Sequence, residues 1–256
     1  MDATRPAKRR KTLPKLDDSF LGQTRSADVP ELHQGRSRAI AHQPGQWAAH
    51  VFVELLPDDA SSQVLKNAVK DASSGLKDSS ATVHSLLDKT RPEKEGQLAS
   101  EDLVLHMSLS RPLILQTNQR GDLKAAVASV ANSAKQPSCC FASFGWLEND
   151  DKTRRFLGVE VGSGYQQLKA LVAILDEQFV RLRLPRYYDT PRFHCSLAWT
   201  ITTSNKATPD THLPFDNDVI ELLNSKYGSV LSHEPMTPSH LCVKVGKVVT
   251  RYPFAS

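Results

Sequence analysis

Short runs in which apolar and polar residues alternate are the most regular pattern in this sequence. A strand places successive side chains on opposite faces, so these runs predict strands with one face turned toward a core. Between them lie runs in which apolar residues recur every three or four positions, which predict amphipathic helices. The predicted strands cover residues 47–56, 103–110, 139–148, 154–161, 193–200, 240–245 and 247–254. The predicted helices cover residues 61–76, 122–135, 165–182 and 219–227, with a further short helix through His84, Leu86 and Leu87 as one option.

Turn and cap residues between these runs indicate how the elements connect. Residues 149–152 form a polar four-residue link typical of a hairpin, and Gly246 joins the last two strands as another hairpin. Pro57–Asp59 ends the first strand and offers helix-capping groups, while Ser163 and Gln166 match a capping box for the longest helix. Strands grouped as hairpins, with helices between them, predict an α+β fold with an antiparallel sheet in each of two similar halves.

Two of the predicted strands carry nearly the same short string, Leu-His-Met-Ser-Leu and Phe-His-Cys-Ser-Leu. The alternation puts His106 with Ser108 on one face of the first strand, and His194 with Ser196 on one face of the second. Ser is so common in this chain that counting alone does not separate two His-x-Ser strings from chance. The matching strand phase supports the hypothesis that the two polar faces meet across one cleft. The predicted core faces are Leu103, Leu105, Met107 and Leu109 in the first strand, and Phe193, Cys195, Leu197 and Trp199 in the second; Ala198 and Thr200 fall on the predicted polar face.

Composition narrows the class of protein only modestly. The 256 residues are 39% hydrophobic and 23% charged, with a net charge of +4, which is ordinary for a soluble protein and permits a polyanionic partner. No apolar run reaches the length of a membrane span, and the polar, basic beginning is unlike a secretory signal. The four cysteines form no Cys-x-x-Cys pair, so we expect reduced thiols and no zinc site.

Residues 1–43 differ from the remainder of the chain. They hold few large apolar residues and no sustained periodicity, which predicts a disordered tail followed by one domain over residues 44–256. Residues 5–15 contain six basic side chains and no acidic one. Such a cluster is typical of a nuclear-import signal or an RNA-attracting arm, and a solvated charged tail is the alternative.

Two histidines and two serines on one surface permit acid–base phosphoryl transfer without a metal. Imidazole titrates near neutrality, so one His can accept a proton while the other donates one. A Ser two positions along the strand points the same way and can donate to a phosphate oxygen. With RNA, the ribose 2′-hydroxyl is an internal nucleophile whose attack leaves a 2′,3′-cyclic phosphate. Other chemistries lack their motifs: the chain has no Gly-x-Ser-x-Gly elbow, no His-Glu-x-x-His and no Walker or dinucleotide glycine pattern.

The flanks of the two strings resemble the U6 small nuclear RNA phosphodiesterase family, within the two-histidine phosphoesterase superfamily. The matching runs are residues 105–111, 153–161, Gly164, 188–199, 243–246 and 252–254, and the resemblance covers residues 44–256. It implies a bilobal, pseudo-twofold fold and a nuclear 3′-to-5′ exoribonuclease that trims the oligouridine tail of U6 RNA. It further implies transesterification to a terminal 2′,3′-cyclic phosphate, which some members open to a 3′-phosphate. We expect no cofactor and no metal, a single-stranded RNA 3′ end as the partner, and a monomer that does not associate with membranes.

The resemblance also implies roles for particular residues. His106, Ser108, His194 and Ser196 form the active-site quartet, with His194 assigned as the base and His106 as the acid, an order that the sequence itself leaves open. Tyr188 matches an aromatic residue that stacks on the terminal base; Tyr187 is the neighbouring alternative, and simple loop packing is the third reading. Arg111 and Arg192 are candidate phosphate contacts. Two other functions stay open: a small-nucleotide 2′,3′-cyclic phosphodiesterase, and a non-catalytic RNA-binding module.

Overall fold

The computed structural model describes residues 43–75, 82–87, 103–202, 215–233 and 235–255. Every described residue belongs to one compact unit, Ala41–Ser256. Residues 1–42 of the predicted basic tail therefore lie outside the described residues. None of the described helices is long and apolar enough to cross a membrane.

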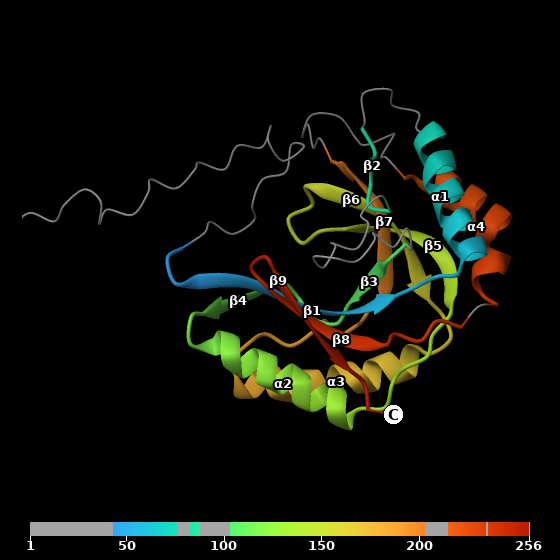
Figure 1. Cartoon of the computed structure of the whole chain (residues 1–256). Coiled ribbons are helices and arrows are strands. Elements are labelled where there is room, and N and C mark those ends of the chain that lie inside the picture. Colours follow the sequence, from blue (N-terminus) through green and yellow to red (C-terminus); the bar gives the residue numbers. More distant parts are fainter. Residues whose placement is uncertain (1–42, 76–81, 88–102, 203–214, 234, 256) are drawn as a thin grey trace, which may run out of the picture. The chain divides into compact units, whose positions relative to one another are not determined.

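Nine strands of the described chain form one sheet, in which every pairing is antiparallel. The strands are β1 (Gln46–Leu55), β2 (His84–Ser85), β3 (Leu105–Ser108), β4 (Leu113–Gln116), β5 (Phe141–Glu148), β6 (Arg154–Val161), β7 (His194–Ile201), β8 (His240–Val245) and β9 (Val248–Pro253). Their order is β5-β6-β7-β3-β1-β8-β9, with β2 paired to β7 and β4 paired to β1 (Figure 1). The sequence predicts a sheet in each half, and the structure joins the two at its centre, where β3 meets β7 through the pair Met107–Cys195.

The helices pack in two groups on different strands of the sheet, and each group with its strands forms one lobe (Figure 1). The helices are α1 (Asp59–Ser74), α2 (Gln119–Ser133), α3 (Tyr165–Arg181) and α4 (Asn217–Leu231). In the first lobe α2 packs on β4, β8 and β9, and α3 packs on α2. In the second lobe α4 packs on β5, and α1 packs on α4 and β7. The lobes thus do not coincide with the halves of the sequence, because α1 and α3 each cross to the lobe opposite the strand that precedes them.

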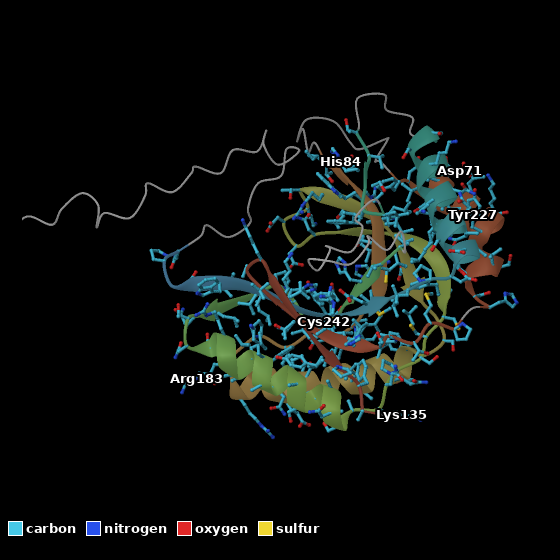
Figure 2. All side chains as sticks on the ribbon, in the orientation of Figure 1. Asp71, His84, Lys135, Arg183, Tyr227 and Cys242 are labelled. Atoms are coloured by element: carbon cyan, nitrogen blue, oxygen red, sulfur yellow. The ribbon has the colours of Figure 1, made fainter. Side chains whose placement is uncertain are left out.

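Contacts between α1 and α4 stabilise the position of α1 in the second lobe. Asp71 on α1 accepts hydrogen bonds from Lys226 and Tyr227 on α4, at 2.6 and 2.7 Å (Figure 2). The ion pair is largely exposed, so its contribution is small compared with the apolar stripe beneath it. The buried side chains of α1 are Ser61, Ser62, Leu65, Ala68, Val69 and Ala72.

Most predicted elements are confirmed, with shifted ends. The predicted core faces of β1 and β3 are buried, as is the stripe of α3 from Leu168 to Phe179. Asp58 caps α1 by accepting from the Ser61 amide at 2.8 Å. α4 continues to Leu231, four residues beyond the predicted end, and β4 was not predicted.

Three sequence expectations are wrong. The predicted helix through His84 is instead the short strand β2, paired to β7. Ser163 does not cap α3: its carbonyl accepts from the Cys140 amide as an extension of the sheet, and Gly164 occupies the cap with φ 84°. A side chain at Gly164 would collide with the Ser138 backbone, and this positive φ favours glycine.

The third correction concerns the far end of β7. A register shift between Leu157 and Gly158 of β6 inserts an extra residue into β7, so Trp199 comes to lie opposite Phe156. Phe156 lines the same cavity as His194, so Trp199 shares the face of the histidine and not that of Cys195. Trp199 is still buried, because its ring stacks on His84 at 4.3 Å. Ala198 and Thr200, predicted on the polar face, are both buried.

Candidate active site

The pairing of β3 with β7 brings the two His-x-Ser strings together. Met107 lies opposite Cys195 in an antiparallel pair, so Ser108 comes opposite His194 and His106 opposite Ser196. Met107 and Cys195 are fully buried, which leaves the four polar side chains on the other face. Residues opposed in this way have Cβ atoms about 5 Å apart. The two polar faces therefore lie side by side on one sheet, and the predicted quartet is a single cluster.

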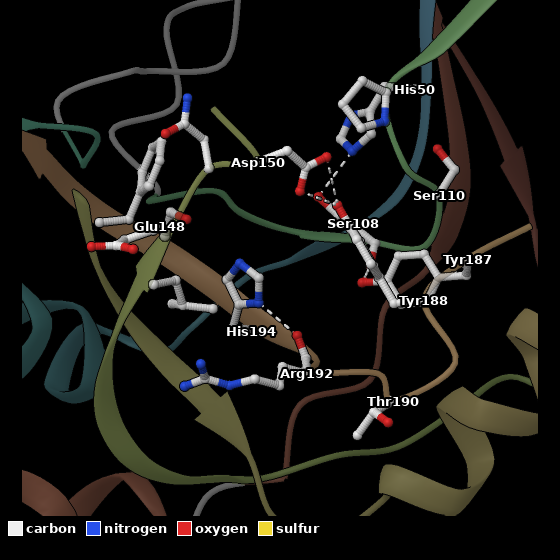
Figure 3. Close-up of a pocket in the computed structure, with 15 residues that line it drawn as sticks. His50, Ser108, Ser110, Glu148, Asp150, Tyr187, Tyr188, Thr190, Arg192 and His194 are labelled. Atoms are coloured by element: carbon white, nitrogen blue, oxygen red, sulfur yellow. Dashed lines mark hydrogen bonds between the residues drawn. The ribbon is translucent and has the colours of Figure 1, made fainter. Parts of the chain in front are cut away.

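A cavity of about 410 Å³ opens beside this cluster (Figure 3). It takes residues from both lobes: His50, Ser108, Ser110, Pro112, Leu147, Glu148, Asn149, Asp150, Phe156, Tyr187, Tyr188, Thr190, Arg192, His194 and Ser196. His106 is not among the lining residues; it is exposed, and its ring meets Phe52 edge-on at 5.5 Å. Three of the quartet thus line the cavity, and His106 lies next to Ser196 on the same face of the sheet.

His194 is held in one orientation by the backbone. Its Nδ1 lies 2.6 Å from the carbonyl oxygen of Arg192, which can only accept, so Nδ1 carries the proton (Figure 3). In the neutral ring Nε2 is then a free acceptor. Burial lowers the pKa of His194 below its ordinary 6.5, against the opposing effects of the Arg192 carbonyl and of Glu160. A neutral imidazole with Nε2 unprotonated is the form that a general base requires.

Each histidine of the quartet has a glutamate–arginine pair beside it. Glu160 lies opposite His194 on β6 and binds Arg192 through two contacts, of 2.5 and 3.2 Å. Glu54 lies opposite His106 on β1 and binds Arg251 through two contacts, of 2.7 and 2.8 Å. The pseudo-twofold relation of the two strands therefore extends to their neighbours. Arg192, expected to contact phosphate, directs its guanidinium to Glu160.

Ser108 is fixed more firmly than Ser196. The Ser108 hydroxyl lies 2.9 Å from Nε2 of His50. The backbone carbonyl of Ser108 accepts a hydrogen bond from the Tyr187 hydroxyl at 3.1 Å. Within the described residues the Ser196 hydroxyl makes no hydrogen bond. Sequence reasoning missed His50. Alternation does place it opposite the core face of β1, but its proximity to Ser108 depends on the pairing of β1 with β3.

The two tyrosines before β7 differ in exposure and contacts. Tyr187 is buried, and its ring stacks on Phe193 at 5.9 Å. Tyr188 is 37% exposed, with its hydroxyl 3.3 Å from a carboxylate oxygen of Asp150. The guanidinium of Arg111 covers one face of the Tyr188 ring at 4.2 Å. Tyr188 thus offers an aromatic surface at the cavity, and Arg111, expected to contact phosphate, supports that ring.

The described residues of this site form neither a metal-ligand cluster nor an accessible cysteine nucleophile. Among the described residues no group of three or more His, Cys, Asp and Glu side chains could hold a metal ion. Cys195 adjoins His194 in sequence but is fully buried on the opposite face, and burial raises the pKa of its thiol well above the usual value. A thiol in that state is a poor nucleophile.

Comparison with solved structures gives the fold. The structure of Kluyveromyces marxianus Usb1 with uridine monophosphate matches with a TM-score of 0.51, covering 81% of this chain and 98% of that one at 16% identity. The structure of Kluyveromyces marxianus Usb1 alone matches with a TM-score of 0.50 at 17% identity. These likenesses confirm the predicted α+β architecture.

Comparison by sequence finds relatives described as U6 snRNA phosphodiesterase 1. The protein from Danio rerio is 30% identical over 174 residues, which are 68% of this chain and 56% of the relative. The Neurospora crassa protein is 29% identical over 216 residues, covering 73% and 57%, and the Homo sapiens protein 29% over 176 residues, covering 68% and 58%. This chain therefore spans somewhat more than half the length of these relatives. They confirm the resemblance predicted from the flanks of the two strings.

A family model covers nearly the whole chain. It is named HVSL, is described as "Uncharacterised conserved protein", and matches residues 13–253. A match of this extent includes both lobes, the quartet and part of the predicted tail. The chain belongs to the HVSL family.

Proposed function

We propose that this chain is a metal-independent RNA phosphodiesterase, a 3′-to-5′ exoribonuclease that trims the oligouridine tail of U6 snRNA. The observation that carries the proposal is the geometry of His194: Nδ1 is committed to a backbone carbonyl, and Nε2 is left as an acceptor at the cavity that Ser108 and Ser196 also line. The relatives described as U6 snRNA phosphodiesterase 1 support the same substrate.

The reaction follows from this arrangement. Nε2 of His194 accepts the proton of the ribose 2′-hydroxyl, and the 2′-oxygen attacks the adjacent phosphorus. The bond from phosphorus to the 5′-oxygen of the terminal nucleotide breaks, and His106 donates a proton to that oxygen. Ser108 and Ser196 donate to the non-bridging oxygens as charge develops. The products are an RNA one nucleotide shorter with a 2′,3′-cyclic phosphate, and a released nucleoside.

Opening of the cyclic phosphate uses the same groups in reverse. After cleavage His194 is protonated and His106 is neutral. His106 can then take a proton from water while the oxygen of that water attacks phosphorus. Protonation of the departing 2′-oxygen by His194 leaves a 3′-phosphate and restores both histidines to their starting states.

Tyr188 is the stacking platform for the terminal base in this proposal. Its ring is exposed at the cavity and backed by Arg111, so a base can stack on the open face. The uridine monophosphate in the Kluyveromyces marxianus Usb1 structure supports uridine as the nucleotide held. Tyr187, buried beneath it, positions Ser108 instead of contacting the base. We also propose that the protein acts in the nucleus, in RNA processing linked to splicing. We propose that it works as a monomer.

Incubation of the protein with a uridine-tailed RNA in excess chelator tests the proposal. We expect stepwise shortening from the 3′ end, with mass spectrometry identifying a terminal 2′,3′-cyclic phosphate or 3′-phosphate. Rapid turnover of 2′,3′-cyclic uridine monophosphate without any shortening of RNA would indicate a small-nucleotide enzyme. Salt-sensitive RNA binding without any product, unchanged by His194→Gln, would indicate a non-catalytic binding module.

A further inference from the structure

His50 is a half-buried titratable group that the proposed reaction does not use. It lies on β1 opposite Lys244 of β8, two residues before Phe52, which is opposite Ser108. Its ring stacks on Phe52 with centroids 5.2 Å apart and planes 15° apart, and it meets the His106 ring edge-on at 6.0 Å. These contacts fix the ring so that Nε2 points to the Ser108 hydroxyl at 2.9 Å (Figure 3).

The direction of this hydrogen bond decides what Ser108 can do. If Nε2 accepted the hydroxyl proton, only oxygen lone pairs would face an incoming phosphate, which is itself negatively charged. If Nε2 carries the proton, it donates to the serine oxygen and leaves the hydroxyl proton free for a phosphate oxygen. Only the second arrangement suits an anionic substrate.

We infer that His50 is a positioning residue, whose Nε2–H donates to Ser108 Oγ and directs the Ser108 hydroxyl toward the scissile phosphate. This inference deepens the proposed function and rests on it. Burial first, then the nearby His106 and Lys244, lowers the pKa of His50 to about 4, so the ring is neutral at physiological pH. A neutral ring fixes the serine without adding a further titrating charge beside His106.

Among the described residues of the second lobe, β6 carries no histidine at the position that corresponds to His50. Gly158 stands opposite Ser196, as Phe52 stands opposite Ser108, and Phe156 takes the place that His50 has on β1. A phenyl ring offers no hydrogen bond. The positioning of the serine is therefore confined to the lobe that also carries His106, the proposed acid.

A double-mutant cycle on uridine-tailed RNA tests the inference. His50→Phe keeps an aromatic ring without a donor, and we expect kcat/KM to fall about 10-fold, mainly through kcat. His50→Gln retains an amide donor and should stay within about 3-fold of the wild type. Adding His50→Phe to Ser108→Ala should cost nothing further, whereas adding it to Ser196→Ala should multiply the two separate losses. Independent losses in the Ser108→Ala background, or an unaffected His50→Phe enzyme, would overturn the inference.

Two measurements do not depend on turnover. Nitrogen-15 chemical shifts of the wild-type protein at neutral pH should show His50 protonated at Nε2; protonation at Nδ1 would overturn the inference even if RNA is cleaved. Inorganic phosphate binding, followed by the nitrogen-15 shifts of the remaining histidines, should weaken in His50→Phe and in Ser108→Ala, and the double variant should bind as Ser108→Ala does. If the wild type binds phosphate in this way yet leaves RNA uncut, the proposed function fails while the positioning role stands. Additive weakening in the double variant, or no weakening in His50→Phe, would reject the positioning role.

Discussion

The two His-x-Ser strands share one frame and differ in their surroundings. In both, a glutamate on the neighbouring strand lies opposite the histidine and binds an arginine. His194 is half-buried and its Nδ1 is bound to a backbone carbonyl, whereas His106 is exposed. Ser108 is bonded by His50 and Tyr187, whereas Gly158 stands opposite Ser196. The pseudo-twofold axis thus supplies four matched positions, and the difference in their surroundings is the basis on which we propose His194 as the base and His106 as the acid.

Removing either histidine should give the largest effect. His194→Ala and His106→Ala should each lower kcat/KM about 10² to 10⁴-fold, since each removes one proton-transfer group. Steady-state kinetics on a uridine-tailed RNA measures the loss, and thermal unfolding verifies that the variants fold. Because His194 must be unprotonated to act and its pKa lies below 6.5, the acid limb of the wild-type pH profile should fall below that pH. Substantial activity in either variant would contradict the proposal that one histidine is the base and the other the acid.

The serines should rank next, and unequally. Ser108→Ala and Ser196→Ala each remove one donor to the phosphate, worth about 10 to 10³-fold in kcat. We expect the larger loss at Ser108, since its hydroxyl is already oriented by His50. Comparison of kcat for the two variants decides this. Equal losses would mean that the difference between the lobes has no catalytic consequence.

The tyrosines test which ring contacts the base. Tyr188→Ala removes a stacking surface and should raise KM about 10-fold or more, while Tyr188→Phe keeps the ring and should change KM little. Tyr187→Phe removes the hydroxyl that binds the Ser108 carbonyl, so its effect should appear in kcat. Kinetic constants for the three variants separate the roles. A rise in KM for Tyr187→Phe together with an unaffected Tyr188→Ala would reverse the assignment.

The glutamates should give the smallest and most specific effect. Glu160 raises the pKa of His194, so Glu160→Gln should lower that pKa further and move the acid limb of kcat/KM to lower pH, by less than about one unit. Glu54→Gln is the matched control on the other lobe and should leave that limb in place. A shift of the acid limb with Glu54→Gln, and none with Glu160→Gln, would transfer the base to His106.

Local pattern predicted a large part of this fold and site. Alternation gave the buried faces of β1 and β3, and the matched strings gave the quartet, because both depend on neighbours along the chain. The pairing of β3 with β7 then follows from burying Met107 and Cys195 on the same side.

What the sequence did not reveal depends on contacts between distant segments. β4 is a four-residue run after Pro112, too short to show a period. The β-bulge that turns Trp199 arises from register with β6, and His50 becomes functional only where β1 lies beside β3. Alternation within one strand does not determine where the apolar stripe of α1 or α3 packs. The crossing of these two helices between the lobes therefore could not be predicted from it.

A single substitution in the RNA tests the central claim, that an internal 2′-hydroxyl performs the cleavage with one histidine as its base and the other as the acid for the leaving oxygen. The substrate is a uridine-tailed RNA with a 2′-deoxy sugar at the penultimate nucleotide, incubated in chelator beside the all-ribose RNA. We predict that the all-ribose RNA shortens and ends in a cyclic phosphate or 3′-phosphate, while the deoxy RNA keeps its last nucleotide. Removal of that nucleotide at the normal rate would contradict the account, because a different nucleophile would then be at work.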